Sequence, residues 1–205
     1  SDRGVLMGLP PPGLHQLVLV FLLAGLAGML PAWSLAATQE RPDEELRQVL
    51  IDAINSSDSF EDRFDAEVWL TDMSQRLQTR VRSPEERLTI LRTVHYEARR
   101  AALDPELILA VINVESNFDR FAISSAGAQG LMQIMPFWLD EIGQPDDNLM
   151  DIRTNIRFGC TILSHYLKRE KGNMHRALAR YNGSVGKHWY PNRVFKSLSS
   201  RWYKQ

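Results

Sequence analysis

Cysteine is nearly absent from this chain of 205 residues, which contains only Cys160. A single thiol cannot form an internal disulfide, and it cannot build a cysteine-based zinc site. As a nucleophile it would need an adjacent histidine, but His165 lies further along the chain, on a different face of the expected helix. Cys160 is therefore interpreted as a small core residue.

An excess of charge of one sign is also lacking, because the formal net charge is −1. This balance gives no reason to expect nucleic acid as a partner. The five histidines include no His-Glu-x-x-His arrangement, and none has a second ligand at metal spacing. We therefore expect no metal and no other cofactor. The apolar content of 44% is ordinary for a globular protein, and the length allows one domain plus extensions.

The sequence has no comfortable membrane span in its N-terminal part. The unbroken apolar run from Leu17 to Leu30 has 14 residues, whereas a spanning helix needs about 20. Pro31 and the small residues of Ser34-Leu35-Ala36 follow this run, at the spacing that signal peptidase prefers. Residues 1–37 are predicted to be a signal peptide, with an uncleaved anchor as the alternative. Both predict export, and we expect a periplasmic protein.

No convincing strand pattern occurs, so the mature protein is predicted to be all-α. Residues 38–82 are charged and form a predicted helical prefix, with one helix from about Phe60 to Val81. Caps and chain breaks predict later helices over about 83–102, 104–115, 137–142, 151–171, 174–181 and 190–202. The helices from residue 83 onward are assigned to one domain, 83–205.

The stretch from Asp104 to Pro136 is the most informative part of the chain. Asp104 is an N-cap acceptor and Pro105 fits the first helical turn. The helix that follows is apolar nearly all round, which predicts that it is buried. Its last residue, Glu115, leaves an apolar segment and faces the negative end of the helix dipole. Both effects raise the pKa of a carboxyl, as a general acid working near neutral pH requires.

The loop after Glu115 has almost no side-chain bulk between Ser124 and Gly130, so backbone or ligand can approach closely. An apolar run around Gln133 follows. An acid, a bare loop and an amide on an apolar wall predict a groove for a polar, ring-shaped substrate. The alternative is a surface glutamate followed by an ordinary glycine-rich connection.

Three motifs carry a resemblance to a known family. They are Glu115-Ser116, the run from Ser124 to Pro136 with Gly127-Ala128-x-Gly130-Leu131-Met132-Gln133-Ile134-Met135, and Ala179-Arg180-Tyr181-Asn182-Gly183. In this order and spacing they resemble the signature motifs of soluble lytic transglycosylases, over about residues 103–194. The resemblance implies a goose-type lysozyme-like helical domain that cleaves peptidoglycan. The usual Tyr-Asn-Ala-Gly of the third motif is here Tyr-Asn-Gly-Ser, which changes the turn but keeps the aromatic ring and the amide.

The resemblance also implies a mechanism with one glutamate, where ordinary glycosidases use two carboxylates. In this family the acid protonates the glycosidic oxygen between N-acetylmuramate and N-acetylglucosamine. It then takes the proton of the muramyl C6 hydroxyl, and a 1,6-anhydro end forms without water. The implied partner is therefore the glycan strand of peptidoglycan.

The resemblance assigns roles to individual residues. Glu115 matches the catalytic position, and Tyr181 matches a tyrosine close to the acid, whose hydroxyl is expected to orient or polarise Glu115. The predicted substrate-binding residues are Ser124, Gly130, Met132, Gln133, Asn182 and Tyr190, of which Tyr190 is a loose match.

Two other functions stay open. A hydrolytic muramidase would use water and a second acid as base, and Asp119 is nearest in sequence to Glu115. A protein that binds the cell wall without cleaving it would use the same fold with no need for Glu115.

Overall fold

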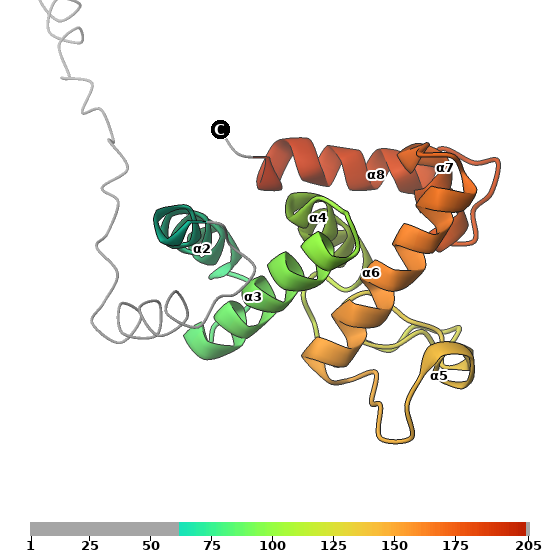
Figure 1. Ribbon diagram of the computed structural model, residues 1–205, viewed down its shortest axis with the longest axis horizontal. Helices are drawn as coiled ribbons and strands as arrows, with labels where there is room; N and C mark the ends of the chain where they lie inside the picture. Colours follow the sequence, from blue (N-terminus) through green and yellow to red (C-terminus); the bar gives the residue numbers. More distant parts are fainter. Residues whose placement is uncertain (1–61, 204–205) are drawn as a thin grey trace, which may run out of the picture. The chain divides into compact units, whose positions relative to one another are not determined.

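The computed structural model describes residues 62–203, which form helices joined by turns (Figure 1). The elements are α2 (Arg63–Leu77), α3 (Pro84–Arg100), α4 (Pro105–Glu115), α5 (Phe137–Ile142), α6 (Ile152–Arg169), α7 (Met174–Tyr181), α8 (Trp189–Ser197) and a π-helical turn, η1 (Leu198–Trp202). The predicted signal segment 1–37 and residues 38–61 of the predicted prefix lie outside the described residues. Of the helices described, none combines the length and the apolar character needed to span a bilayer.

The all-α prediction is confirmed for this part of the chain. Extended backbone pairing occurs only as two isolated bridges between residues 62 and 203, Ile123 with Gln129 and Gln129 with Ile134. They fold the glycine-rich stretch back on itself, and the amide of Gly130 adds a bond to the carbonyl of Ala122 at 2.9 Å. The predicted bare loop is therefore a hydrogen-bonded double turn.

Helix starts follow the predicted caps. The side chains of Ser83, Asp104, Asp151 and Asn173 each accept a hydrogen bond from a backbone N–H in the first turn of α3, α4, α6 and α7 respectively. Each cap satisfies one of the amides that a helix start leaves unpaired. These four boundaries were therefore readable from the sequence.

Two helices differ from their predicted bounds. Helix α2 begins after the cap Asp62 and ends at Leu77, so it is shorter than the predicted Phe60–Val81 helix at its C-terminal end. The last predicted helix, 190–202, begins one residue earlier, at Trp189, and is α-helical only to Ser197. Its final turn widens to a π-helix, in which Trp202 is fully buried.

Helix α4 is the buried centre of the described fold. Its residues from Leu107 to Ile112 are all buried, and it packs against α3, α8 and η1. Figure 1 shows it between α3 and α8. Helix α6 packs against α3 and α7, and α7 in turn packs against α8, a neighbour of α4. The third motif, at the end of α7, therefore lies near α4. Because α4 is packed on several sides, the position of its last residue, Glu115, is well defined.

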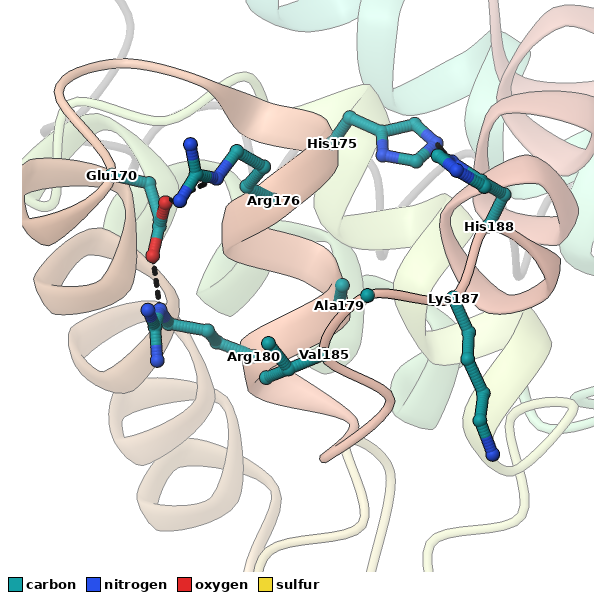
Figure 2. Close-up of a pocket in the computed structure, with 9 residues that line it drawn as sticks. Glu170, His175, Arg176, Ala179, Arg180, Val185, Lys187 and His188 are labelled. Carbon is teal, nitrogen blue, oxygen red and sulfur yellow. Dashed lines mark hydrogen bonds and ion pairs between the residues drawn. The ribbon is translucent and has the colours of Figure 1, made fainter.

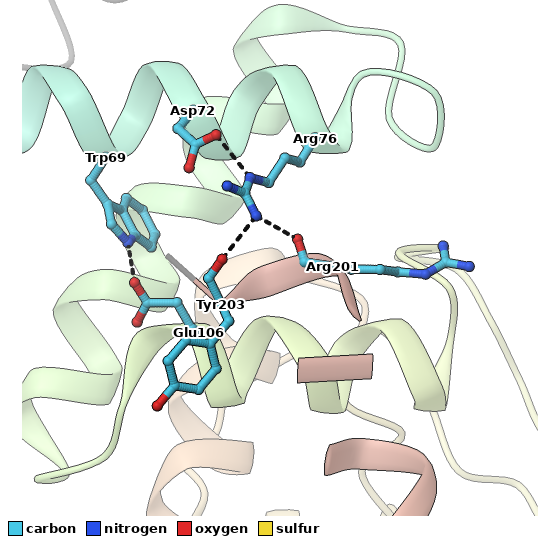
Figure 3. A network of polar contacts seen from close by, with 6 residues as sticks. All are labelled: Trp69, Asp72, Arg76, Glu106, Arg201 and Tyr203. Atoms are coloured by element: carbon cyan, nitrogen blue, oxygen red, sulfur yellow. Dashed lines mark hydrogen bonds and ion pairs between the residues drawn. The ribbon is translucent and has the colours of Figure 1, made fainter. Parts of the chain in front are cut away.

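Helix α2 packs on α3 and η1 and is fastened by polar contacts (Figure 3). The Arg76 guanidinium bonds Asp72 at 2.8 Å and donates through Nη1 to the carbonyls of Arg201 and Tyr203, at 2.8 and 3.1 Å. The indole N–H of Trp69 donates to Glu106 of α4 at 2.8 Å. This part of the predicted prefix therefore packs against the helices of the domain.

Candidate active site

Glu115 is the last residue of α4, and the chain reverses directly after it. Ser116 caps the helix, and the next two residues, Asn117 and Phe118, have positive φ angles of 51° and 69°. Such a left-handed pair is rare for residues with side chains. Phe118 is buried, and its ring lies 5.3 Å from that of Trp202. This packing stabilises the turn, and Glu115 lies at the edge of the core.

The carboxyl of Glu115 is half-buried and accepts a hydrogen bond from the Tyr190 hydroxyl at 2.5 Å. Burial raises its pKa from 4.5 to about 7, although the Tyr190 hydroxyl and the charge of Arg193 both oppose the shift. The predicted direction of the pKa shift is thus found in the structure. Near neutral pH a substantial fraction of Glu115 carries a proton, as a general acid requires.

Tyr190 is fully buried apart from 1% of its surface. Burial, and then the nearby charge of Glu115, hold the pKa of its phenol well above the usual range. The hydroxyl is therefore a permanent donor to Glu115. Tyr190 thus contacts the acid, from the first turn of α8, and its contact with the substrate stays a prediction.

Tyr181 does not have the contact predicted for it. Its hydroxyl donates to the carbonyl of Met132 at 2.7 Å, so the proton expected to polarise Glu115 is used elsewhere. Burial, and next the charge of Glu115, hold the pKa of Tyr181 well above its usual value. The charge of Glu115 thus acts on Tyr181, but the Tyr181 hydroxyl bonds the backbone of the second motif. The hydroxyl that bonds the Glu115 carboxyl is that of Tyr190.

The backbone at Leu131 and Met132 is held from three directions. The Ser116 hydroxyl donates to the Leu131 carbonyl at 2.8 Å, and Tyr181 bonds the Met132 carbonyl. The Met132 amide donates to the side chain of Asn155 at 2.8 Å. The three motifs therefore meet at this segment, and the first and third motifs each contribute one hydroxyl to it.

Asn155 of α6 was missed by the sequence analysis. It is 1% exposed, and its side-chain nitrogen donates to the carbonyls of Gln129 and Leu149, at 2.9 and 2.8 Å. With the bond from Met132, the amide has three partners, which stabilises a polar group inside the core. An asparagine next to Ile156, within the buried side of a predicted amphipathic helix, was the available signal.

Two glycines allow these contacts. A Cβ on Gly130 would lie 2.4 Å from the Asn155 side-chain nitrogen, and one on Gly159 would lie 2.2 Å from the Met132 sulfur. Gly130 also has a φ of 74°, which favours glycine. Asn155 and Leu149 fill the space beside Gly130, and its role in substrate binding stays a prediction.

Met132 has no exposed surface, which argues against the substrate contact predicted for it. It packs in the core against Gly159. Met135 and Trp138 are half-buried, which keeps part of each side chain at the surface.

Ser124 and Gln133 shape the loop. The Ser124 oxygen accepts from the Ala128 amide at 3.0 Å, and the Gln133 side-chain nitrogen donates to the carbonyls of Ala122 and Gly130, at 3.1 and 3.0 Å. What remains for a ligand is the hydroxyl proton of Ser124 and the amide oxygen of Gln133. Asn182 is half-buried, and its side chain has no hydrogen-bond partner among the described residues. Substrate binding by these three residues stays a prediction.

No second carboxylate assists Glu115 within the described part of the chain. Arg193 is the charged side chain there that shifts its pKa. Asp119 is exposed, and its carboxylate accepts from the backbone amide of Phe121 at 2.9 Å in a local turn. Between residues 62 and 203, no three His, Cys, Asp or Glu side chains are grouped closely enough to hold a metal ion. The arrangement offers one acid with a hydroxyl donor, which suits proton transfer.

Comparison with known proteins gives a consistent match. The family model "Transglycosylase SLT domain" matches residues 92–201. The transglycosylase of Enterobacteria phage PRD1 is 34% identical over 104 residues, 47% of this chain and 38% of the relative. Membrane-bound lytic murein transglycosylase C of Mannheimia succiniciproducens is 37% identical over 82 residues, 36% of this chain and 23% of the relative.

The matched regions thus span well under half the length of both relatives. Among solved structures, the lytic transglycosylase Slt of Pseudomonas aeruginosa is similar with a TM-score of 0.44 and 23% identity, over 74% of this chain and 29% of that one.

Proposed function

Since the chain belongs to the transglycosylase SLT domain family, we propose that it is a peptidoglycan lytic transglycosylase. In this proposal it cleaves the β-1,4 bond between N-acetylmuramate and N-acetylglucosamine and leaves a 1,6-anhydromuramyl end. The observation that carries the proposal is the Glu115 carboxyl, with a pKa of about 7 and a hydrogen bond from a buried tyrosine.

In the first step Glu115 acts as the acid. Its proton passes to the glycosidic oxygen as the bond from that oxygen to C1 of the muramyl ring breaks. The leaving sugar departs with a hydroxyl, and the substrate's own N-acetyl group stabilises the positive charge at C1. This explains why a second carboxylate is not needed.

In the second step the Glu115 carboxylate acts as the base. It takes the proton of the muramyl C6 hydroxyl while that oxygen bonds to C1. The ring closes, Glu115 regains its proton, and no water is consumed. A group that alternates between the two states works best with a pKa near the operating pH, and the Tyr190 hydroxyl stabilises the carboxylate between the steps.

The hydrolytic alternative requires a base that activates water. Asp119, the residue considered for that role, is exposed and engaged in a turn with Phe121. Its position favours a local structural role over catalysis. The same geometry supports the one-glutamate route, in which Glu115 performs both proton transfers.

The organisation of the whole chain is part of the proposal. Peptidoglycan lies outside the cytoplasm, so we propose that residues 1–37 direct export to the periplasm, with or without cleavage. Residues 83–205 form the proposed catalytic domain. Residues 38–82 precede it, and the contacts of α2 with α3 and η1 support a packing role for their described part.

Product analysis tests the proposal. Purified full-length protein is incubated with peptidoglycan, and the soluble fragments are analysed by mass spectrometry. Anhydro ends are lighter than reducing ends by one water. We expect anhydro ends from the natural protein and about 10²–10⁴-fold fewer from Glu115→Gln. Reducing ends would establish hydrolysis instead, and wall binding without fragments from the natural protein would favour the non-catalytic alternative.

A further inference from the structure

A second functional surface lies beside the third motif. A pocket of about 310 Å³ is formed by the C-terminal end of α6, by α7 and by the loop that follows α7 (Figure 2). This loop, with Val185 and Lys187 at the pocket, is the short connection between Tyr181 and Tyr190. The pocket therefore adjoins the segment that carries both site tyrosines, although the mechanism above uses none of its residues.

Two arginines of α7 flank the carboxylate of Glu170 at one end of the pocket (Figure 2). Glu170 forms an ion pair with Nε of Arg176 at 2.6 Å, and it accepts a hydrogen bond from Nε of Arg180. The Arg180 bond, together with both positive charges, lowers the pKa of Glu170, which therefore stays ionised. Because the carboxylate uses the Nε atoms, the contacts to Glu170 leave the terminal nitrogens of both guanidinium groups for other partners.

The pocket carries more positive than negative charge. Arg176, Arg180 and Lys187 are three cations, whereas Glu170 is the only carboxylate among the lining residues. His175 and His188 bound the pocket on the side of α8, with Nε2 of the first 3.5 Å from Nδ1 of the second. Ala179 and Val185 add an apolar surface between the two ends, as Figure 2 shows.

A purely structural role explains only part of this arrangement. An ion pair that joins α6 to α7 needs Glu170 and one arginine. The side chain of Arg176 is 68% exposed, and an exposed ion pair contributes little to stability. Paired guanidinium groups with free terminal nitrogens are instead suited to a planar anion, because the fork geometry matches a carboxylate.

We propose that this pocket binds a carboxylate of the peptide stems carried by the glycan strand. The inference rests on the proposed function, because it takes peptidoglycan as the substrate. Peptide stems are attached to the muramyl residue, whose bond to the next sugar is cleaved. A carboxylate is favoured over a more highly charged group, because Glu170 lies in the same wall and repels a dianion more strongly.

The test compares two substrates. One is purified wall with intact peptide stems, and the other is the same wall after an amidase has removed the stems. The ratio of the cleavage rates on the two substrates is measured for the natural protein and for Arg176→Gln. We expect the variant to lower the ratio of intact to stripped about tenfold, since it loses a charged hydrogen bond to the stem. An equal change on both substrates would overturn the proposal.

Two further variants keep the test decisive. Arg153→Gln makes the same change at an exposed arginine in the first turn of α6, outside the pocket, and should leave the ratio unchanged. Lys187→Gln alters a pocket residue whose side chain has no hydrogen bond or ion pair in the described structure, so it separates binding from folding. It should lower the ratio, by less than Arg176→Gln.

Chemical amidation of the stem carboxyls identifies the group recognised. We expect amidated wall to reduce the rate of the natural protein to about that of Arg176→Gln on untreated wall. If amidation has no effect, the pocket does not bind a carboxylate. Failure of the proposed function looks different, because the natural protein would then release no anhydro ends from either the intact or the stripped wall.

Discussion

The two ends of α4 carry glutamates with nearly the same titration behaviour. Burial is the largest cause of the raised pKa of both, about 7 for Glu106 and about 7 for Glu115. Each accepts one hydrogen bond from an aromatic side chain, Glu106 from the Trp69 indole and Glu115 from the Tyr190 hydroxyl. By pKa alone, either residue would qualify as a general acid.

Their surroundings separate them. Glu106 faces α2, with the N-cap residue Asp104 beside it, and its partner Trp69 is 6% exposed (Figure 3). Glu115 faces α8 and adjoins the segment where the three motifs meet. A raised pKa therefore identifies a buried carboxyl, and only the convergence of the motifs identifies a site. This comparison leads to four predictions.

The largest expected effect separates the two carboxyls directly. Glu115→Gln keeps the shape of the side chain but removes the transferable proton, and we expect wall cleavage to fall by about 10²–10⁴-fold. Glu106→Gln should stay within about twofold of the natural rate, since no proton transfer depends on it. Release of soluble fragments from purified wall measures both. Similar losses in the two variants would contradict the distinction.

Tyr190→Phe should move the pH dependence of cleavage. The hydroxyl stabilises the ionised Glu115, so its loss raises the pKa of Glu115 further above 7. The acid form then persists to higher pH, and the alkaline limb of kcat/KM should shift upward by about one pH unit. We also expect a rate about tenfold lower, because the acid is no longer oriented. A downward shift of the limb would show that the hydroxyl favours the protonated form.

Tyr181→Phe should act on stability instead. It leaves the Met132 carbonyl, now bonded by Tyr181, without its donor. Loss of such a bond costs about 1 kcal/mol or somewhat more. Urea unfolding measures the change in free energy of unfolding. The alkaline limb should stay where it is in the natural protein, and a shift equal to that of Tyr190→Phe would mean that Tyr181 is the true partner of Glu115.

The smallest effect concerns Glu106 and pH. Its pKa is about 7 in the folded protein and 4.5 ordinarily, so the folded state binds the proton more tightly. The stabilisation is complete below about pH 4.5 and is lost as the pH rises through 7. The Glu106→Gln variant has no carboxyl at this position, so it lacks this pH-dependent change in stability. Glu106 is only half-buried, so solvent screening reduces the effect of the shift. Between pH 5 and pH 8, the natural protein should lose on the order of 1 kcal/mol more stability than this variant. Parallel pH dependences in urea unfolding would contradict the raised pKa.

The sequence predicted one end of α4 better than the other. At Glu115 the helix dipole and the apolar surroundings act in the same direction, and the structure shows the raised pKa. At Glu106 the dipole favours the ionised form by about 0.3–1 kcal/mol. Burial beneath Trp69 outweighs it, but this contact joins residues 37 apart in sequence. A local pattern cannot reveal such a contact.

Contacts between distant parts of the chain also explain why the sequence predicted Tyr181 as the partner of Glu115, whereas the structure shows Tyr190. Helix caps are local, so the starts of α3, α4, α6 and α7 were predicted correctly. The direction of a hydroxyl depends on how α7 and α8 pack, and Tyr190 reaches Glu115 across 75 residues. Asn155 was missed for a related reason, because its three partners lie in loops whose path is set only in the folded protein.

The central claim is that Glu115 is held partly protonated near neutral pH, and titration of its carboxyl carbon by ¹³C NMR tests it most directly. The measurement is best made in the Glu106→Gln variant, which removes the other carboxyl with a pKa near 7. The structure predicts a pKa of about 7 for Glu115. A value near the ordinary 4.5 would mean that the carboxyl is ionised at neutral pH and would contradict its proposed role as the acid.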